Sequence, residues 1–330
     1  MIIKKNNINK IMTIDIPFQE PNSTEKEVFL KLQNIIIPNH ISYIAYPWAN
    51  LIEYARKDKI NLYSYLLKNN LPDYFNNKIN ITTWQYYQVY PYIDLFKKMN
   101  INIVFSPHAE KNKFKYYYEK YNIKILPIFL IPIINPSFKI HDNIEIIDSN
   151  INYKFSFIGN INYANNKDLT KKRTLISNLL KLRNDCYLKI NTSWHLDNKI
   201  YGKDLGFIKF NSDKEYIQKL NENNYFFKMN NTLYPIVPLG MGPNSFRVTE
   251  SIAFGKVPII ISDNLWLPII NNYQMEDYCI IIKEKDIPNL NYILDNLNEI
   301  ELNNKQKIII EIKNSEEFTN LAYPVIKYIN

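Results

Sequence analysis

Apolar runs of strand length alternate with helical patterns between residues 41 and 131. Strands are expected at residues 40–47, 78–84, 101–106 and 124–132, with helices around residues 50–57 and 91–99. This alternation is typical of a parallel sheet covered by helices. The pattern therefore predicts a first α/β domain, to which we assign residues 1–140.

A second alternating series follows a stretch without a helical period. Residues 132–150 contain Pro132 and Pro136, and this composition predicts a junction between domains. Beyond it, strands are expected at residues 153–159, 186–190, 234–239, 256–262 and 279–283, with helices at residues 168–183, 212–224 and 244–254. Ser212 and Glu215 have the spacing of a capping box for the helix at residues 212–224.

The simplest fold for this pattern is two Rossmann-like parallel-sheet domains that face a cleft, an α/β architecture. We assign residues 141–302 to the second domain. Residues 303–330 have a helical pattern, and we predict that this segment packs back on the first domain.

Composition indicates a folded protein, since 46% of the residues are hydrophobic and 22% are charged. The net charge of +8 would suit an anionic partner such as a nucleotide, an acidic glycan or nucleic acid. The alternative is lysines scattered over the surface of a chain rich in Asn, Lys, Ile and Tyr. Basic residues interleaved with aromatics on one face are not evident, so no nucleic-acid partner is expected.

Cysteine, histidine and apolar segments suggest neither metal binding nor secretion. Cys186 and Cys279 lie in apolar runs, and the four histidines are dispersed. We recognise neither a signal peptide nor an apolar stretch long enough for a transmembrane segment. We therefore expect a reducing, cytoplasmic setting, no metal ligands and no resident cofactor.

The most informative segment is residues 238–263, PLGMGPNSFRVTESIAFGKVPIIISD. All six glycines of the chain lie at residue 159 or beyond, and Gly240 and Gly242 stand before Pro243 in a tight turn after an expected strand. Asn244 or Ser245 can cap the helix that follows. Unpaired backbone N–H groups at a helix N-terminus form an anion site, so this turn is a candidate site for a diphosphate.

Two side chains of the same helix strengthen the hypothesis. Arg247 lies in the first turn, where a cation is disfavoured unless an anion joins it, and its guanidinium can bind phosphate oxygens. Glu250 can accept hydrogen bonds from hydroxyl groups or orient Arg247; the alternative is a simple surface ion pair. Asp263 ends the next strand, where it either contacts a ligand or caps the following segment.

These motifs resemble the C-terminal half of the exostosin-like glycosyltransferases, the GT47 type. The resemblance is carried by SFxxxE within PxGxGxxSFRxxExxxxGxxPxxxxD, and upstream by FSFIGN at residues 155–160 and by Arg173. It covers roughly residues 153–285. The chain differs from animal and plant relatives in having Lys256 where many have cysteine and no recognised anchor or stalk, which suggests a soluble bacterial or viral member.

The resemblance implies a GT-B fold and glycosyl transfer with inversion at the anomeric carbon. The donor would be a nucleotide sugar, expected to be UDP-linked, used without a metal, and the acceptor would be a glycan. Arg173 and Arg247 would hold the diphosphate, and Glu250 the ribose or the sugar. The remaining donor-site candidates are Gly159, Asn160, Gly242, Asn244, Ser245 and Asp263.

Inverting transfer also needs a base for the acceptor hydroxyl. His108 and Glu110, which follow an expected strand of the first domain, are the candidates, although His108 alternatively caps the next helix. Glu53 and Asp94 are weaker candidates because they lie in or near helices.

Aromatic residues end two strands that we expect to face the cleft. Trp48 and Trp84, together with Tyr86 and Tyr87, can stack on acceptor sugar rings, with core packing as the alternative for each. Two other functions stay open: a sugar-nucleotide epimerase or hydrolase of GT-B-like shape, and a non-catalytic module that binds nucleotide sugars or glycans.

Overall fold

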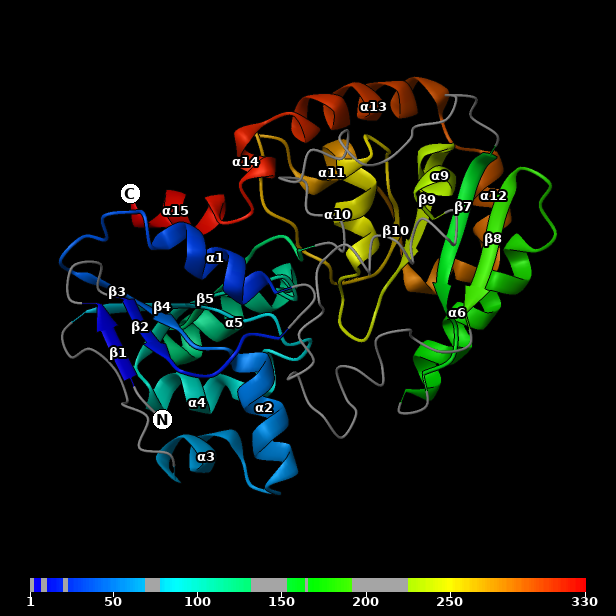
Figure 1. Ribbon diagram of the computed structural model, residues 1–330. Coiled ribbons are helices and arrows are strands. Elements are labelled where there is room, and N and C mark those ends of the chain that lie inside the picture. The colour runs from blue at the N-terminus through cyan, green and yellow to red at the C-terminus, as the bar shows by residue number, and fades with distance from the viewer. Residues whose placement is uncertain are drawn as a thin grey trace.

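The chain forms two α/β domains in a computed structural model (Figure 1). The structure describes residues 3–6, 11–19, 23–68, 78–131, 153–163, 166–191 and 225–330. Each domain is built on its own sheet, and the prediction of two α/β domains is confirmed.

The first domain contains a six-stranded sheet whose spatial order follows the chain, β1-β2-β3-β4-β5-β6. Only β1 runs antiparallel to its neighbour, and the other pairs are parallel. The strands are β1 (Ile3–Asn6), β2 (Ile11–Ile14), β3 (Ile41–Ala45), β4 (Ile79–Thr83), β5 (Ile101–Ser106) and β6 (Lys124–Pro127).

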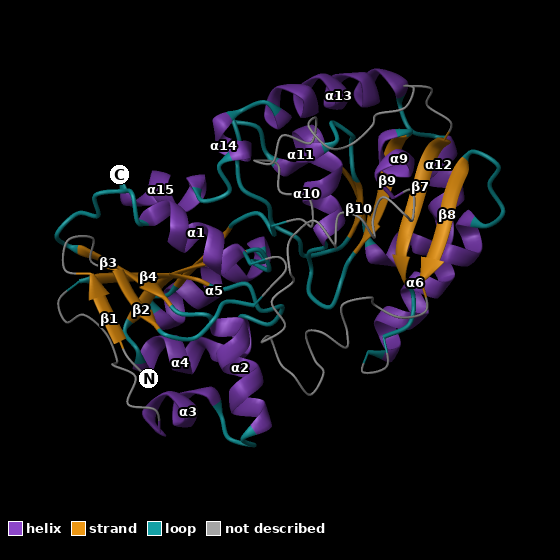
Figure 2. Ribbon diagram, in the orientation of Figure 1, coloured by secondary structure: helices purple, strands orange, loops and turns teal. Residues whose placement is uncertain are grey.

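Helices cover both faces of this sheet (Figure 2). Alternate residues of a strand point to opposite faces, so Tyr43 packs in the cluster with α1 while Ile44 packs in the cluster with α2, α3 and α4. Burial on both faces explains the continuous apolar runs in the sequence. The helices are α1 (Thr24–Leu32), α2 (Trp48–Lys57), α3 (Leu62–Lys68), α4 (Ile93–Lys98) and α5 (Lys111–Tyr121).

The second domain has a five-stranded parallel sheet in the order β11-β10-β9-β7-β8. The strands are β7 (Tyr153–Asn160), β8 (Cys186–Asn191), β9 (Thr232–Pro238), β10 (Ile259–Ile261) and β11 (Ile280–Ile282). The α-helices are α6 (Lys167–Leu180), α9 (Tyr225–Asn230), α10 (Phe246–Ala253), α11 (Met275–Tyr278) and α12 (Leu290–Asp295). The order is that of a doubly wound sheet, with a topological switch point between β7 and β9.

The end of the chain returns to the first domain (Figure 1). Helix α13 (Glu299–Lys313) starts where Asn298 accepts hydrogen bonds from two first-turn amides, four residues before the expected start. It is followed by α14 (Glu316–Thr319) and α15 (Tyr323–Ile329). Val325 and Ile329 of α15 are buried in the same cluster as Val28 of α1.

Other expectations differ from the structure or lie outside it. The pattern of residues 1–40 gave no signal for β1, β2 or α1. The predicted junction at residues 132–150, and the helix at residues 212–224 with its capping box, lie outside the described residues. Within the described ranges, none of the helices combines the length and the apolar character needed to cross a bilayer.

Candidate functional site

The candidate site lies at the carboxyl ends of β7 and β9, on either side of the switch point. Chain connections leave these two strands in opposite directions, and ligands of open α/β sheets bind in the crevice at such a point. The residues predicted for donor binding come from β7, α6 and the turn between β9 and α10. Topology therefore brings together segments that are far apart in the sequence.

Arg173 of α6 hydrogen-bonds to the backbone at the carboxyl ends of both β7 and β9. Its Nε donates a hydrogen bond to the carbonyl oxygen of Asn160 at 2.7 Å, and its Nη1 donates to the carbonyl oxygen of Leu239 at 2.6 Å. Its side chain is almost fully buried, and burial lowers its pKa, as does the neighbouring charge of Arg247. Arg173 is therefore hydrogen-bonded to the backbone and shapes the site, whereas the resemblance implied that it would hold the diphosphate.

Gly159 is required by this arrangement. A Cβ atom at Gly159 would lie 2.8 Å from Nη2 of Arg173, which is closer than real Cβ contacts. The rings of Phe157 and Tyr163 flank the guanidinium, each with its centroid 5.4 Å from Cζ. The glycine predicted to approach a donor thus makes room for the arginine.

Arg247 and Glu250 lie on α10 next to Arg173. Ser245 is the N-cap residue, and its hydroxyl accepts a hydrogen bond from the backbone N–H of Arg247. Nη1 of Arg247 donates to Oε2 of Glu250, and Nε donates to the carbonyl oxygen of Ile158 at 3.2 Å. The structure therefore pairs the two side chains that the sequence placed three residues apart.

Glu250 is fully buried, so this is not a surface ion pair. The hydroxyl of Tyr225 donates to its Oε2 at 2.6 Å, and the ring of Tyr225 lies 4.3 Å from the guanidinium carbon of Arg247. Among the described residues, Oε1 of Glu250 has no hydrogen-bond partner. The site thus contains two neighbouring arginines, one carboxylate and a buried acceptor atom without a donor.

The glycine turn before α10 contacts the first domain. A Cβ at Gly242 would lie 2.5 Å from Nδ1 of His108, and the amide of Asn244 donates to the carbonyl oxygen of Pro107 at 2.8 Å. Asn244 is buried, and its Oδ1 accepts a hydrogen bond from the N–H of Ser245. Gly242 and Asn244, predicted to bind the donor, instead hold the two domains together.

The two predicted bases lie at the same contact, and neither is set up as a base. Burial lowers the pKa of His108 to about 3, so the imidazole is neutral at physiological pH and binds a proton only weakly. Glu110 accepts a hydrogen bond from Nζ of Lys113 at 2.8 Å, and its backbone pairs with Leu265 of the second domain. Both residues connect the domains.

Three further predictions are decided by packing. Trp48 and Trp84 are fully buried, so neither ring can stack on a sugar, and their assignment to the acceptor site is wrong. Their indole N–H groups donate within the domain, to Thr82 and to the carbonyl oxygen of Gln88. Asp263 does not cap the segment that follows it: its Oδ1 accepts the N–H of Glu284, 21 residues further on and just after β11, at 3.0 Å.

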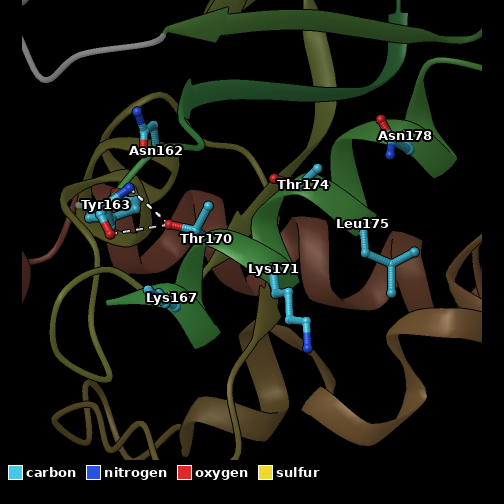
Figure 3. A pocket seen from close by; sticks show the side chains of 8 residues that line it. All are labelled: Asn162, Tyr163, Lys167, Thr170, Lys171, Thr174, Leu175 and Asn178. Carbon is cyan, nitrogen blue, oxygen red and sulfur yellow. Dashed lines mark hydrogen bonds between the residues drawn. The ribbon is translucent and has the colours of Figure 1, made fainter. Parts of the chain in front are cut away.

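A surface pocket of about 420 Å³ adjoins the switch point on the outer side of α6 (Figure 3). Tyr163 belongs both to this pocket and to the aromatic pair around Arg173, and its backbone exchanges hydrogen bonds with the hydroxyl of Thr170. The lining residues are Asn162, Tyr163, Lys167, Thr170, Lys171, Thr174, Leu175 and Asn178. Two lysines make this surface basic.

Sequence reasoning missed Tyr225 and Tyr163. Tyr225 lies 25 residues before Glu250, and no local spacing links the two. Over the described part of the chain, no three His, Cys, Asp or Glu residues are grouped so as to hold a metal ion.

The chain has two parallel-sheet domains that meet at their carboxyl edges, and the second domain carries a basic site at the N-terminus of a helix. This arrangement defines the GT-B class of glycosyltransferases. The exostosin GT47 domain matches residues 82–297, about two thirds of the chain, and the chain belongs to this family. The resemblance stated from the motifs is confirmed. The match begins in β4, so it includes the contact between the domains.

Among curated proteins, the chain is similar to a "Probable glucuronosyltransferase 47 A" of Physcomitrium patens, 34% identical over 85 residues, or 26% of this chain and 19% of that protein. A "Probable beta-1,4-xylosyltransferase" of Arabidopsis thaliana is 33% identical over 85 residues, 26% of this chain and 20% of that protein. The chain thus matches about a fifth of the length of these relatives.

Solved structures that are similar over most of the chain include a glycosyltransferase of Rickettsia africae ESF-5. It is 14% identical with a TM-score of 0.47, and 93% of each chain is covered. The pneumococcal O-GlcNAc transferase GtfA is 12% identical with a TM-score of 0.43, with 92% of this chain and 59% of that chain covered.

Proposed function

We propose that the chain is an inverting, metal-independent glycosyltransferase that moves a sugar from a nucleotide donor to a glycan acceptor. The observation that supports this most is the buried group of Arg247, Glu250 and Tyr225 at the N-terminus of α10. The neighbouring Arg173 makes the site cationic overall, because two guanidinium groups outnumber the one carboxylate. An anionic ligand would balance that charge.

A nucleotide sugar fits the groups present. Its diphosphate would meet Arg247 and the first-turn amides of α10, which supply positive charge for the leaving group. Oε1 of Glu250 would accept a hydrogen bond from a ribose or sugar hydroxyl, since a buried acceptor without a donor is unfavourable. In this proposal the cationic side chains take the part that a divalent metal plays elsewhere.

Ligand-induced stabilisation tests the donor site. UDP-xylose and UDP-glucuronate come first, because the plant relatives are named as xylosyl- and glucuronosyltransferases, followed by GDP-, ADP- and CMP-sugars. A donor at 100 times its dissociation constant should stabilise the protein by about 2.7 kcal/mol, with EDTA present. Arg247→Ala should abolish the shift, because it removes the side chain that would meet the diphosphate.

Arg183→Ala is the matched control. Its guanidinium pairs with Asp185 and Asp295 near the amino end of β8, away from the switch point, so this variant should keep the donor-induced shift. Stabilisation that survives Arg247→Ala, or that appears only when a divalent metal is added, would contradict the proposal. Donor binding without turnover would favour a binding module, and an epimerised donor would favour an epimerase.

The expected bacterial or viral source and the cytoplasmic location stay predictions. So does the absence of a nucleic-acid partner, for which the salt dependence of DNA affinity is the direct measurement.

A further inference from the structure

A group of ionisable side chains lies at the carboxyl edge of the first sheet, outside the donor site. Nη1 of Arg56 donates to the two carboxylate oxygens of Glu53 at 3.0 and 3.3 Å, and to the hydroxyl of Tyr86 at 3.4 Å. The ring of Tyr86 packs on Tyr87 at 4.6 Å and edge-on against Tyr92 at 6.2 Å between centroids. The sequence suggested Glu53 as a weaker candidate base and Tyr86 as an acceptor contact, and the proposed donor site uses neither residue.

This group, Glu53, Arg56, Tyr86 and Tyr92, borders the donor domain. The carbonyl oxygen of Tyr87 would lie 2.9 Å from a Cβ at Gly242, so the loop after β4 contacts the turn that leads into α10. Glu53 reaches this loop through Arg56 and Tyr86. A carboxylate of the first domain is thus linked by side-chain contacts to the loop that meets the donor domain.

Two other candidate bases at this edge are enclosed or neutral: Glu25 is 1% exposed and accepts hydrogen bonds from backbone amides, and burial keeps His108 neutral. Glu110 is paired with Lys113 as Glu53 is with Arg56, but Glu110 also pairs through its backbone with Leu265 of the second domain. Glu53 is 8% exposed, so it is shielded but not sealed from the surface. Burial raises its pKa, and the charge of Arg56 opposes that rise, which leaves a carboxylate more basic than an ordinary one.

Sugar recognition suits the rest of the group. The partly exposed ring of Tyr92 offers a face on which a pyranose can stack, and its hydroxyl, with the Arg56 guanidinium, can hydrogen-bond sugar hydroxyls. Tyr86 is buried, and its hydroxyl accepts a hydrogen bond from Arg56. Arg56 has more than half of its side chain exposed, so it is accessible to a ligand, and Tyr92 is half-buried. Polar groups set among aromatic rings are typical of carbohydrate sites.

We propose that Glu53 is the base of the transfer reaction and that Arg56 and Tyr92 hold the acceptor sugar beside it, with Tyr86 positioning Arg56. The inference rests on the proposed function. The acceptor O–H proton passes to the Glu53 carboxylate while the acceptor oxygen bonds to the anomeric carbon. The bond from that carbon to the diphosphate breaks, and its electron pair leaves with the nucleoside diphosphate.

The experiment measures donor binding before transfer. The donor that most stabilises the full chain is given to Glu53→Gln with xylo-oligosaccharides as acceptor probe, and release of nucleoside diphosphate is followed. We expect Glu53→Gln to keep the donor-induced shift and to lose at least about 100-fold in kcat, because it removes the proton acceptor but no donor contact.

A second variant gives a readout that a structural role would not move. In Arg56→Gln the opposing charge is gone, so the pKa of Glu53 rises and the acid limb of the kcat profile should move up by roughly one pH unit or more. The groups that face Glu53 are Arg56 on its own helix and Tyr86 and Tyr92 from the loop after β4. Neither tyrosine ionises in the range tested, since burial raises both pKa values.

Asp15→Asn is the matched control, because Asp15 is an exposed carboxylate directly after β2 at the same edge, two strands from the loop that contacts Gly242. It should keep full transfer. Transfer that persists in Glu53→Gln, or that is lost in Asp15→Asn instead, would overturn the assignment. If no nucleotide sugar stabilises the wild-type chain, the proposed function fails first, and this inference fails with it.

Discussion

At the scale of single residues, the contact between Gly242 and His108 decides what both residues do. The sequence suggested a donor contact for one and a proton transfer for the other. The imidazole instead packs against the backbone of Gly242. The carbonyl oxygen of Tyr87, also from the first domain, lies near the position that a Cβ atom of residue 242 would take. A side chain at position 242 would meet a buried ring and a main-chain oxygen, neither of which can easily give way.

Gly242→Ala should therefore lower the free energy of unfolding by about 1 to 3 kcal/mol, because overpacking forces the two loops apart. Urea unfolding of both proteins measures the change. Met241→Ala is the control: its side chain is exposed, and a change within about 0.5 kcal/mol is expected. Equal stability of Gly242→Ala and wild type would show that the contact tolerates a methyl group.

At the scale of secondary structure elements, Glu25 holds together three segments at the carboxyl edge of the first sheet. It lies in the first turn of α1, and Oε1 accepts the N–H of Gln85, which follows β4, at 3.0 Å. The N-cap residue of α2, Pro47, makes no side-chain cap, and Glu25 interacts with the first-turn amides of that helix instead. One carboxyl group therefore serves α1, α2 and the loop after β4.

This carboxyl group should make stability fall as pH rises. Burial raises the pKa of Glu25 to about 8, despite hydrogen bonds from the amides of Gln85, Ala49 and Trp48, against an ordinary value of 4.5. Between these pH values the folded state keeps a proton that the unfolded state has lost. Rising pH therefore costs stability in that window, by at most about 1.4 kcal/mol per pH unit.

Melting temperatures of wild type and Glu25→Gln from pH 5 to pH 9 isolate the effect, because the amide does not titrate. The wild type should lose stability relative to the variant as pH rises to about 8, and the difference should level off above that value. A difference that stays constant across this range would show that Glu25 does not hold its proton in the folded protein.

At the scale of the whole molecule, the C-terminal helices join the two domains. Phe318 of α14 packs edge-on against Phe129 in the core of the second domain, and Val325 and Ile329 of α15, with the N-cap residue Ala322, complete the core of the first. Together with the contacts that Gly242 and Asn244 make with the first domain, these contacts set how the two sheets face each other. The first sheet depends on α15 for the burial of one of its faces, because α1 covers only part of that face.

Val325→Ala should destabilise the first domain by on the order of 2 kcal/mol, because it leaves a cavity between α15 and the sheet. Hydrogen–deuterium exchange resolves the two domains: amides of β3 to β5 should exchange faster, while those of β9 and β10 should not change. Lys327→Ala, with an exposed side chain on the same helix, should alter neither sheet. Faster exchange confined to the second sheet would contradict this role of α15.

The sequence by itself determined the features that depend on local pattern. Strands buried on both faces leave apolar runs, and the turn, cap, arginine and glutamate between Gly240 and Glu250 lie within one stretch of chain. The two α/β domains, the family and most of the candidate site could therefore be predicted from the sequence. A capping side chain and the helix it starts are neighbours in the sequence, so their physics can be recognised there.

Only the tertiary structure decided which of the candidate side chains reach the site. Asn244 meets Pro107 across 137 residues, and Glu25 meets Gln85 across 60. Contacts between residues so far apart in the sequence depend on how the chain crosses from strand to strand, and no local spacing in the sequence encodes these crossovers. An aromatic residue at a strand end reads the same whether it lines a cleft or fills a core, so Trp48 and Trp84 could be assigned to the core only once their neighbours were in place.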